Sequence, residues 1–333
     1  MAKAAGPGCA YTVLAELVTR RTGLDTGNPA IARRLAEAAP NGIAAHLVAD
    51  LANLPDAAPA WQSLLDQLVI PETYLFRDPA QLALASAVAL APALDAPILG
   101  GRCLEAPSLN ARFVDTLCVD ARFADTLCVD AQVLNARGLD PRSPDRAARA
   151  LRLWSVGCCS GEEAYTLAIL ATQALVRAGL ASPDGAELRG AWSIEVLGSD
   201  ICASLLDRAN AATYGIGILS PFRATPPDCL AFFPGHTHQT RTVRADIRSR
   251  VRFLRAGVMA LLRPALQACD VVACRNVLVY LSEPARRHTL ALLSAAVRPG
   301  GVLLLGPADT PPASGFRTVW SGDAIVYQRK PAP

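Results

Sequence analysis

The sequence predicts a doubly wound α/β fold preceded by a small all-α unit. From residue 151 onward, short apolar segments alternate with segments of helical periodicity. The apolar segments are nearly continuous, as in parallel strands that are covered on both faces. The expected strands are 151–157, 193–199, 250–257, 270–279, 301–306 and 324–329, and the expected helices are 162–178, 203–212 and 284–297.

The first part of the chain has a different rhythm. Between residues 12 and 68 apolar residues recur at spacings of three and four, which predicts helices separated by turns at Asp25, Asn28 and Asn41. We therefore expect a helical domain over 1–69. Residues 70–92 form a linker with the motif ETYLFRD, in which Pro79 opens a helix and Asp78 is its N-cap.

Residues 93–148 form a low-complexity insertion. ARFVDTLCVD at 111–120 is followed directly by ARFADTLCVD at 121–130, a period too short for a solenoid. The segment is either an added binding element or, as we favour, a duplicated and poorly ordered insertion. Residues 149–333 then form the main domain, which a small excursion or β-subdomain interrupts at 214–248.

Composition argues against several classes of protein. The net charge is only +3 and no long run of Lys or Arg offers a surface for nucleic acid. No apolar run approaches the roughly 18 residues of a membrane span, so we expect no membrane insertion and a cytoplasmic location. The ten cysteines form no CxxC pair and the four histidines complete no metal-ligand spacing, which predicts buried, reduced thiols and no metal.

One segment carries a ligand-binding pattern. WSVGCCSGEEAY at 154–165 ends a strand in small residues, including Gly157, so that a ligand can approach the backbone at the start of a helix. Glu162 and Glu163 are either simple capping residues or partners of an ammonium or sulfonium, and they deter phosphate. Asp200 ends the next strand, where it can accept ribose hydroxyls. S-adenosylmethionine fits this set better than NAD or ATP.

A second polar pair lies in an apolar segment. Arg275 and Asn276 belong to CRNVLVYL at 274–281, and they are costly to bury without partners. They either form a structural ion pair or cap, or face the ligand crevice at the carboxyl end of their strand.

The chain resembles the bacterial chemotaxis-receptor glutamate O-methyltransferases, the CheR family. The resemblance runs from about residue 12 to 330, except for 93–148. It rests on IPETYLFRD at 70–78, RLWSVGCCSGEEAYTLA at 152–168, VLGSDICASLLDRANAATY at 196–214, ACDVVACRNVLVYLSEPARR at 268–287 and RPGGVLLLGPAD at 298–309. It implies a small N-terminal helical domain, a linker, and a Rossmann-like S-adenosylmethionine domain with a small inserted β-subdomain.

The resemblance also implies roles for individual residues. Arg77 and Tyr280 are the expected catalytic residues, with Tyr280 near the transferred methyl group. The expected cofactor contacts are Thr73, Arg77, Gly157, Glu162 or Glu163, Asp200, Gly257, Val258, Arg275 and Asn276. The chain departs from the family pattern at Pro71 (often Asn), Ala164 (usually Pro), Cys202 (often Asp) and Gly257–Val258 (often Asn-Leu). We expect an intact but atypical cofactor site.

The implied reaction is methyl transfer to glutamate side chains on the cytoplasmic helices of methyl-accepting chemotaxis receptors. A glutamate carboxylate, with a pKa near 4.3, is already ionised at neutral pH and needs no general base. Residues 1–80 hold six Lys or Arg against eight Asp or Glu, which leaves another protein or a small molecule open as the acceptor. A non-catalytic S-adenosylmethionine-binding scaffold is the third interpretation; positions 71 and 257 favour it, and Arg77 and Tyr280 oppose it.

Overall fold

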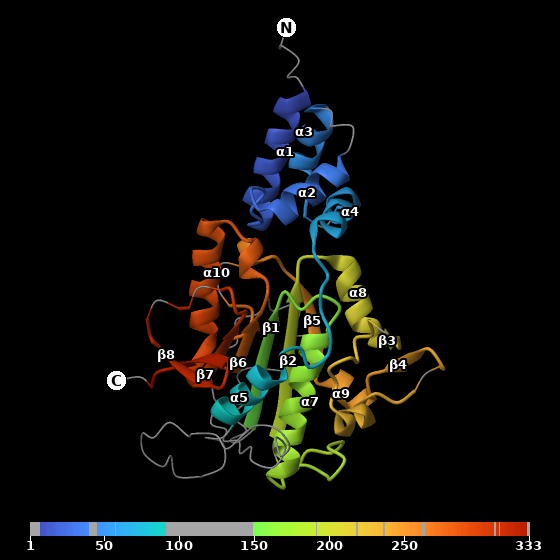
Figure 1. Ribbon diagram of the computed structural model, residues 1–333, viewed down its shortest axis with the longest axis vertical. Coiled ribbons are helices and arrows are strands. Elements are labelled where there is room, and N and C mark those ends of the chain that lie inside the picture. The colour runs from blue at the N-terminus through green and yellow to red at the C-terminus, as the bar shows by residue number, and fades with distance from the viewer. Residues whose placement is uncertain are drawn as a thin grey trace.

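The computed structural model describes residues 7–39, 45–56, 58–90, 149–190, 192–217, 219–235, 237–261, 264–309, 311–312 and 314–331. The insertion predicted at 93–148 lies outside these residues. Figure 1 shows a helical unit stacked on the end of an α/β domain, with the linker running between them.

The helical unit contains α1 (Pro7–Thr22), α2 (Pro29–Ala38), α3 (Ala45–Asn53) and α4 (Pro59–Leu68). Its core is a cluster of buried side chains that includes Leu14, Leu35 and Trp61. The start of α2 follows directly from the sequence, because Asn28 accepts a hydrogen bond from the backbone N–H of Ala30 at 3.0 Å and a proline follows at the first helical position.

The α/β domain has a seven-stranded sheet of order β5-β2-β1-β6-β7-β9-β8. Its strands are β1 (Arg149–Val156), β2 (Trp192–Asp200), β5 (Val251–Arg255), β6 (Cys269–Cys274), β7 (Val297–Leu305), β8 (Phe316–Ser321) and β9 (Ala324–Arg329). The first five in this order are parallel, while β9 pairs antiparallel with both β7 and β8. The direction of winding reverses between β1 and β6, which places a ligand crevice beyond the carboxyl ends of these two strands.

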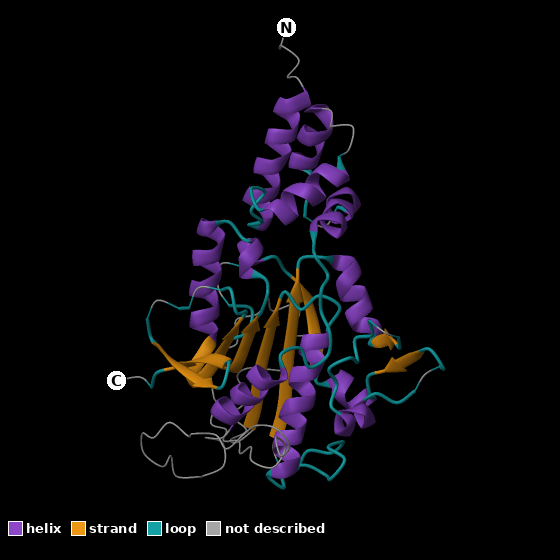
Figure 2. Ribbon diagram, viewed as in Figure 1, coloured by secondary structure: helices purple, strands orange, loops and turns teal. Residues whose placement is uncertain are grey.

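Helices cover both faces of the sheet (Figure 2). Alternate residues of β1 divide between two cores: Leu151 and Leu153 pack with α5 (Pro79–Leu90) and α7 (Glu162–Arg177), whereas Trp154 and Val156 pack with α10 (Glu283–Ala296). The helix α8 (Ala203–Ala211) follows β2 and lies against β5. The predicted doubly wound, Rossmann-like α/β fold is confirmed.

The excursion between α8 and β5 contains a two-stranded antiparallel sheet of β3 (Thr213–Gly215) and β4 (Thr240–Thr242), followed by α9 (Ala245–Ser249). These strands are only three residues long, too short to produce a visible alternation in the sequence.

Two strand predictions differ from the structure. The strand expected at 270–279 ends at Cys274, because Asn276 adopts a left-handed conformation with φ 61° and the chain continues into a 3₁₀ turn, η4 (Leu278–Tyr280). The strand β8 was not predicted: it is an edge strand with largely exposed side chains, so it lacks an apolar pattern.

Within the described ranges, no helix has the length and apolar character needed to cross a membrane. The side chains of Cys158, Cys159, Cys202, Cys229, Cys269 and Cys274 are buried free thiols. The same part of the chain contains no group of His, Cys, Asp and Glu suited to a metal ion.

Candidate active site

One pocket collects nearly all of the predicted site residues. It lies between the helical unit, the linker and the carboxyl ends of β1, β2, β5 and β6. Its lining includes Thr73, Arg77, Gly157, Glu163, Asp200, Gly257, Val258, Arg275, Asn276 and Tyr280. Of the predicted cofactor contacts, Glu162 alone is not part of the lining.

The turn after β1 forms the floor of the pocket. Gly157 has φ 70°, and a Cβ atom there would approach Cγ2 of Val277 to 2.4 Å, so a side chain is excluded by both conformation and space. Gly161, with φ 93°, precedes α7 under the same constraints, since its Cβ would meet Ala209 at 2.9 Å. The small residues of this turn therefore keep the backbone accessible at the start of the helix.

Asp200 stands at the end of β2 beside this turn. Its two carboxylate oxygens each accept one backbone hydrogen bond, from the N–H groups of Cys159 and Cys202, both at 2.9 Å. The residue is only 7% exposed, and burial raises the pKa of its carboxyl group while the backbone donors oppose that rise. Each oxygen keeps a further acceptor position for a ligand hydroxyl.

The two adjacent glutamates of α7 have different surroundings. Glu163 accepts hydrogen bonds from the Ser155 hydroxyl and from Arg275 Nε, each at 2.7 Å, and it faces the pocket. Glu162 is 2% exposed and bonded to the Ser160 hydroxyl, and burial raises the pKa of its carboxyl group. Of the two glutamates left open by the sequence, the structure brings Glu163 to the pocket.

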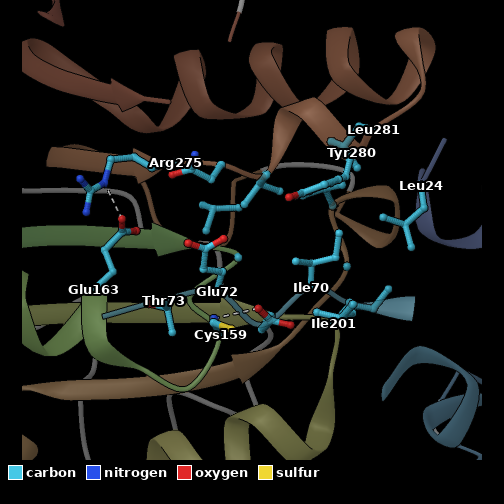
Figure 3. Close-up of a pocket in the computed structure, with 18 of the residues that line it drawn as sticks. Leu24, Ile70, Glu72, Thr73, Cys159, Glu163, Ile201, Arg275, Tyr280 and Leu281 are labelled. Atoms are coloured by element: carbon cyan, nitrogen blue, oxygen red, sulfur yellow. Dashed lines mark hydrogen bonds and ion pairs between the residues drawn. The ribbon is translucent and has the colours of Figure 1, made fainter. Parts of the chain in front are cut away.

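Arg275 ties three segments together. Its Nε forms an ion pair with Glu163 (Figure 3). Its Nη1 donates to the backbone oxygen of Arg77 at 2.7 Å and lies 3.4 Å from the carboxylate of Asp78. Asp78 is at the position before α5, as predicted for its N-cap. The guanidinium of Arg275 thus connects the linker to the sheet. These contacts compensate the free-energy cost of burying its charge.

Arg77 and Tyr280 come to the pocket from different segments, the linker and η4 (Leu278–Tyr280). The Nη1 of Arg77 donates to the backbone oxygen of Glu72 at 2.8 Å, a hydrogen bond that closes a loop of the linker between residues 72 and 77. Tyr280 belongs to η4 and lies across the pocket from the Arg275–Glu163 pair in Figure 3. Both residues line the pocket.

Several lining residues were not predicted. Leu24 comes from the turn between α1 and α2, Ile70 and Glu72 from the linker, Cys159 from the turn and Ile201 from the end of β2. Figure 3 shows Leu24, Ile70 and Ile201 on one side of the pocket and Arg275 with Glu163 on the other. The apolar residues among them carry no sequence signal that would identify them as ligand contacts. Glu72 could have been found, because it belongs to the linker motif ETYLFRD.

The lining suits the expected cofactor, S-adenosylmethionine. Its charged members are Glu72, Glu163 and Asp200 with Arg77 and Arg275, an excess of one carboxylate that complements a ligand carrying two positive groups and one carboxylate. The Oδ1 atom of Asn276 is buried without a hydrogen-bond partner among the described residues, so it awaits a donor. The apolar side of the pocket can hold a base, and Asp200 can hold a ribose.

Comparison with known proteins gives a family match. Residues 130–317 match the CheR methyltransferase S-adenosylmethionine-binding domain. Chemotaxis protein methyltransferase 1 of Pseudomonas aeruginosa is 29% identical over 202 residues, which cover 60% of this chain and 70% of that protein. The probable biofilm formation methyltransferase WspC of the same organism is 31% identical over 190 residues, 54% of this chain and 40% of that protein.

A third relative is an uncharacterized 104.1 kDa protein of Rhodobacter capsulatus, 32% identical over 160 residues. That match covers 48% of this chain and only 15% of the relative. The chain therefore spans very different shares of the relatives it matches, from a small part to more than two thirds.

Proposed function

The chain belongs to the CheR methyltransferase family and is an S-adenosylmethionine-dependent methyltransferase, and from this premise we propose that it methylates glutamate side chains of chemotaxis receptors. One observation carries the proposal: Arg77 and Tyr280 line the same pocket as Asp200 and Glu163. The residues expected to bind the cofactor and a cation suited to a carboxylate acceptor therefore line one pocket.

The residues divide between holding the cofactor and holding the acceptor. Asp200 would hold the ribose hydroxyls, Asn276 would accept from a donor of the cofactor, and Glu163 would face its positive groups. When bound, S-adenosylmethionine supplies a methyl group on a positive sulfur; a carboxylate oxygen bonds to the methyl carbon, the sulfur keeps the electron pair of the broken bond, and an ester and a neutral thioether result.

No proton moves in this reaction, so the chain has to orient the acceptor rather than deprotonate it. The planar guanidinium of Arg77 can hold a carboxylate through two parallel hydrogen bonds. Tyr280, Leu24 and Ile70 also line the pocket, and we expect their apolar surfaces to limit the access of water around the acceptor. Orientation of this kind can contribute about 7–11 kcal/mol to lowering the barrier.

The test is methylation of receptor cytoplasmic fragments with tritiated S-adenosylmethionine. We expect label that is released as methanol by mild base, as a glutamate methyl ester requires, and no label in a fragment whose acceptor glutamates are replaced by alanine. Cofactor binding without base-labile label on any receptor fragment from the same genome would reject this acceptor.

The charge of the helical unit gives a reason to test a second class of acceptor. Its acidic excess does not favour an acidic receptor helix at that surface, and one relative is named for biofilm formation rather than chemotaxis. Base-labile label on a protein other than a receptor, in an extract of the source cell, would support that alternative.

A further inference from the structure

Positive charge is concentrated in one segment of the α/β domain rather than on the helical unit. Residues 203–255 run from α8 through the excursion to the end of β5. They contain eight arginines and three aspartates, and no lysine or glutamate. Residues 1–80 carry the opposite balance, six basic against eight acidic. Within the excursion itself, at 214–248, there are four arginines and two aspartates, a net positive charge that would attract an acidic acceptor.

One arginine of the excursion reaches the linker motif. The Arg223 guanidinium carbon lies 3.7 Å from the centre of the Tyr74 ring, and that of Arg77 lies 5.7 Å from the same ring. Tyr74 and Arg77 both line the pocket. Arg223 is thus joined through one aromatic ring to the residue expected to hold the acceptor carboxylate.

The loop that carries Arg223 is fastened in place. Pro221 accepts a hydrogen bond from the backbone N–H of Leu75 at 2.9 Å, which attaches the excursion to the linker. Ser220 closes the turn by donating to the backbone oxygen of Gly215 and accepting from the N–H of Phe222. A side chain on such a turn needs little ordering when a ligand binds.

Arg223 itself is exposed, and among the described residues it takes part in no ion pair. Two guanidiniums on one ring repel each other, and that repulsion is relieved when anions approach them. Arg77 and Arg223 can therefore bind two carboxylates at once, one in the pocket and one beside it.

We infer that Arg223 determines acceptor specificity by binding an acidic side chain next to the glutamate that is methylated. The inference rests on the proposed function and deepens it: the acceptor is an acidic helix that presents one carboxylate to Arg77 and a neighbouring one to Arg223. Arg223 touches neither the cofactor nor the methylated carboxylate, so it acts on acceptor binding and not on the chemical step.

The test compares Arg223→Glu with Arg248→Glu, which makes the same change of charge on α9 of the same excursion. Both variants and the wild type are assayed for methylation of a receptor cytoplasmic fragment, for binding of that fragment by fluorescence anisotropy with S-adenosylhomocysteine present, and for affinity for S-adenosylhomocysteine alone. We expect Arg223→Glu to raise KM and the fragment Kd about ten-fold or more, with kcat and S-adenosylhomocysteine affinity within about two-fold. Arg248→Glu should change each of these by less than about two-fold.

The outcomes separate this inference from the proposed function. Unchanged fragment affinity in Arg223→Glu, or an equal loss in both variants, would overturn the role of Arg223 while methylation by the wild type still stood. If the wild type forms no methyl ester, the proposed function fails, and fragment binding decides the inference: binding that Arg223→Glu abolishes supports it, and no binding by the wild type overturns it.

Discussion

At the residue scale, neighbouring acids in one motif have separate roles. Glu162 and Glu163 were equivalent in the sequence, but successive residues of a helix point about 100° apart. Glu163 therefore faces Arg275 and the pocket, while Glu162 is buried beside Ser160. The motif predicted an acid at this place, and only the packing of α7 against the sheet selected which one.

Asp200→Ala should weaken S-adenosylhomocysteine binding about ten- to a hundred-fold, because a charge-assisted hydrogen bond contributes about 1.5–3 kcal/mol. The variant also frees the N–H groups of Cys159 and Cys202, so its melting temperature must be measured alongside calorimetric affinity. An unchanged affinity in a folded variant would remove Asp200 from the site.

The same residue predicts a pH dependence. Burial raises the pKa of Asp200, so the folded, ligand-free protein keeps this proton at a pH where the unfolded chain has lost it. Its contribution to stability is thus full below the ordinary pKa and is lost as the pH rises through the raised value. Cofactor affinity changes in the opposite sense, because the protonated carboxyl group is a weaker hydrogen-bond acceptor. The affinity therefore falls as the pH drops through the raised pKa, and this fall occurs at a higher pH than for an aspartate with an ordinary pKa.

Arg77→Lys should lose most methyl transfer although it keeps the positive charge, because an ammonium cannot make two parallel bonds to a carboxylate. Arg77→Ala should lose at least as much, and both should keep nearly the wild-type melting temperature, since the side chain is partly exposed and Asp78 is 4.0 Å away. Turnover and melting are measured together on the three proteins. A lysine variant with near wild-type turnover would exclude the bidentate role.

At the element scale, the turn between α1 and α2 clasps the segment that carries Tyr280. Leu24 and Leu281 form a β-bridge, Asp25 N–H donates to the Tyr280 backbone oxygen at 2.8 Å, and the Asn28 side chain donates to the Val279 oxygen at 3.1 Å. The helical unit therefore positions one wall of the pocket as well as covering it.

Asn28→Asp tests this clasp without removing the helix cap. An aspartate still accepts from the Ala30 N–H, but it cannot donate to the Val279 oxygen. We expect a nearly unchanged melting temperature and S-adenosylhomocysteine affinity reduced about five-fold, from the loss of about 1 kcal/mol. Asn28→Ala is the matched control, because it removes both the helix cap and the hydrogen bond to Val279. Loss of the cap should lower the free energy of unfolding by about 1 kcal/mol. Wild-type affinity in the aspartate variant would contradict the clasp.

A second contact joins α4 to the start of α8, close to Asp200. The carboxylate of Asp66 accepts hydrogen bonds from the Cys202 thiol and the Ser204 hydroxyl, both at 2.8 Å. This geometry gives a physical reason for cysteine at a position where the family often has aspartate. A second carboxylate there would face that of Asp66 directly.

Cys202→Asp should accordingly destabilise the protein by about 1–3 kcal/mol, because it places like charges in contact in a partly buried site. Adding Asp66→Asn to that variant should restore more than half of the loss, since the amide donates to the new carboxylate. Denaturant unfolding of the wild type, both single variants and the double variant completes the cycle. Additive losses would show that Asp66 and position 202 are not coupled.

At the scale of the whole molecule, the pocket is composite. Its described lining comes from the helical unit, the linker and the ends of several strands. The family connects the segments on either side of the insertion more directly, so we expect the insertion to be dispensable for binding the cofactor.

Deletion of residues 98–145 should leave S-adenosylhomocysteine affinity within a few-fold of the full chain, since shortening a loop changes the closure entropy only slightly. The measurement is calorimetry on the deletion variant, with circular dichroism to confirm its fold. A folded variant that no longer binds would show that the insertion contributes to the site.

The sequence by itself determined the main alternation of strands and helices, the glycine turn after β1 and the residue types at the carboxyl ends of β1, β2 and β6, because these depend on local periodicity and backbone conformation. Tertiary structure decided which of these residues meet. Leu24, the Glu163–Arg275 pair and the stacking of Arg223 on Tyr74 join segments far apart in the chain. Such contacts follow from how the helical unit, linker and excursion pack on the sheet, and no local pattern encodes that packing.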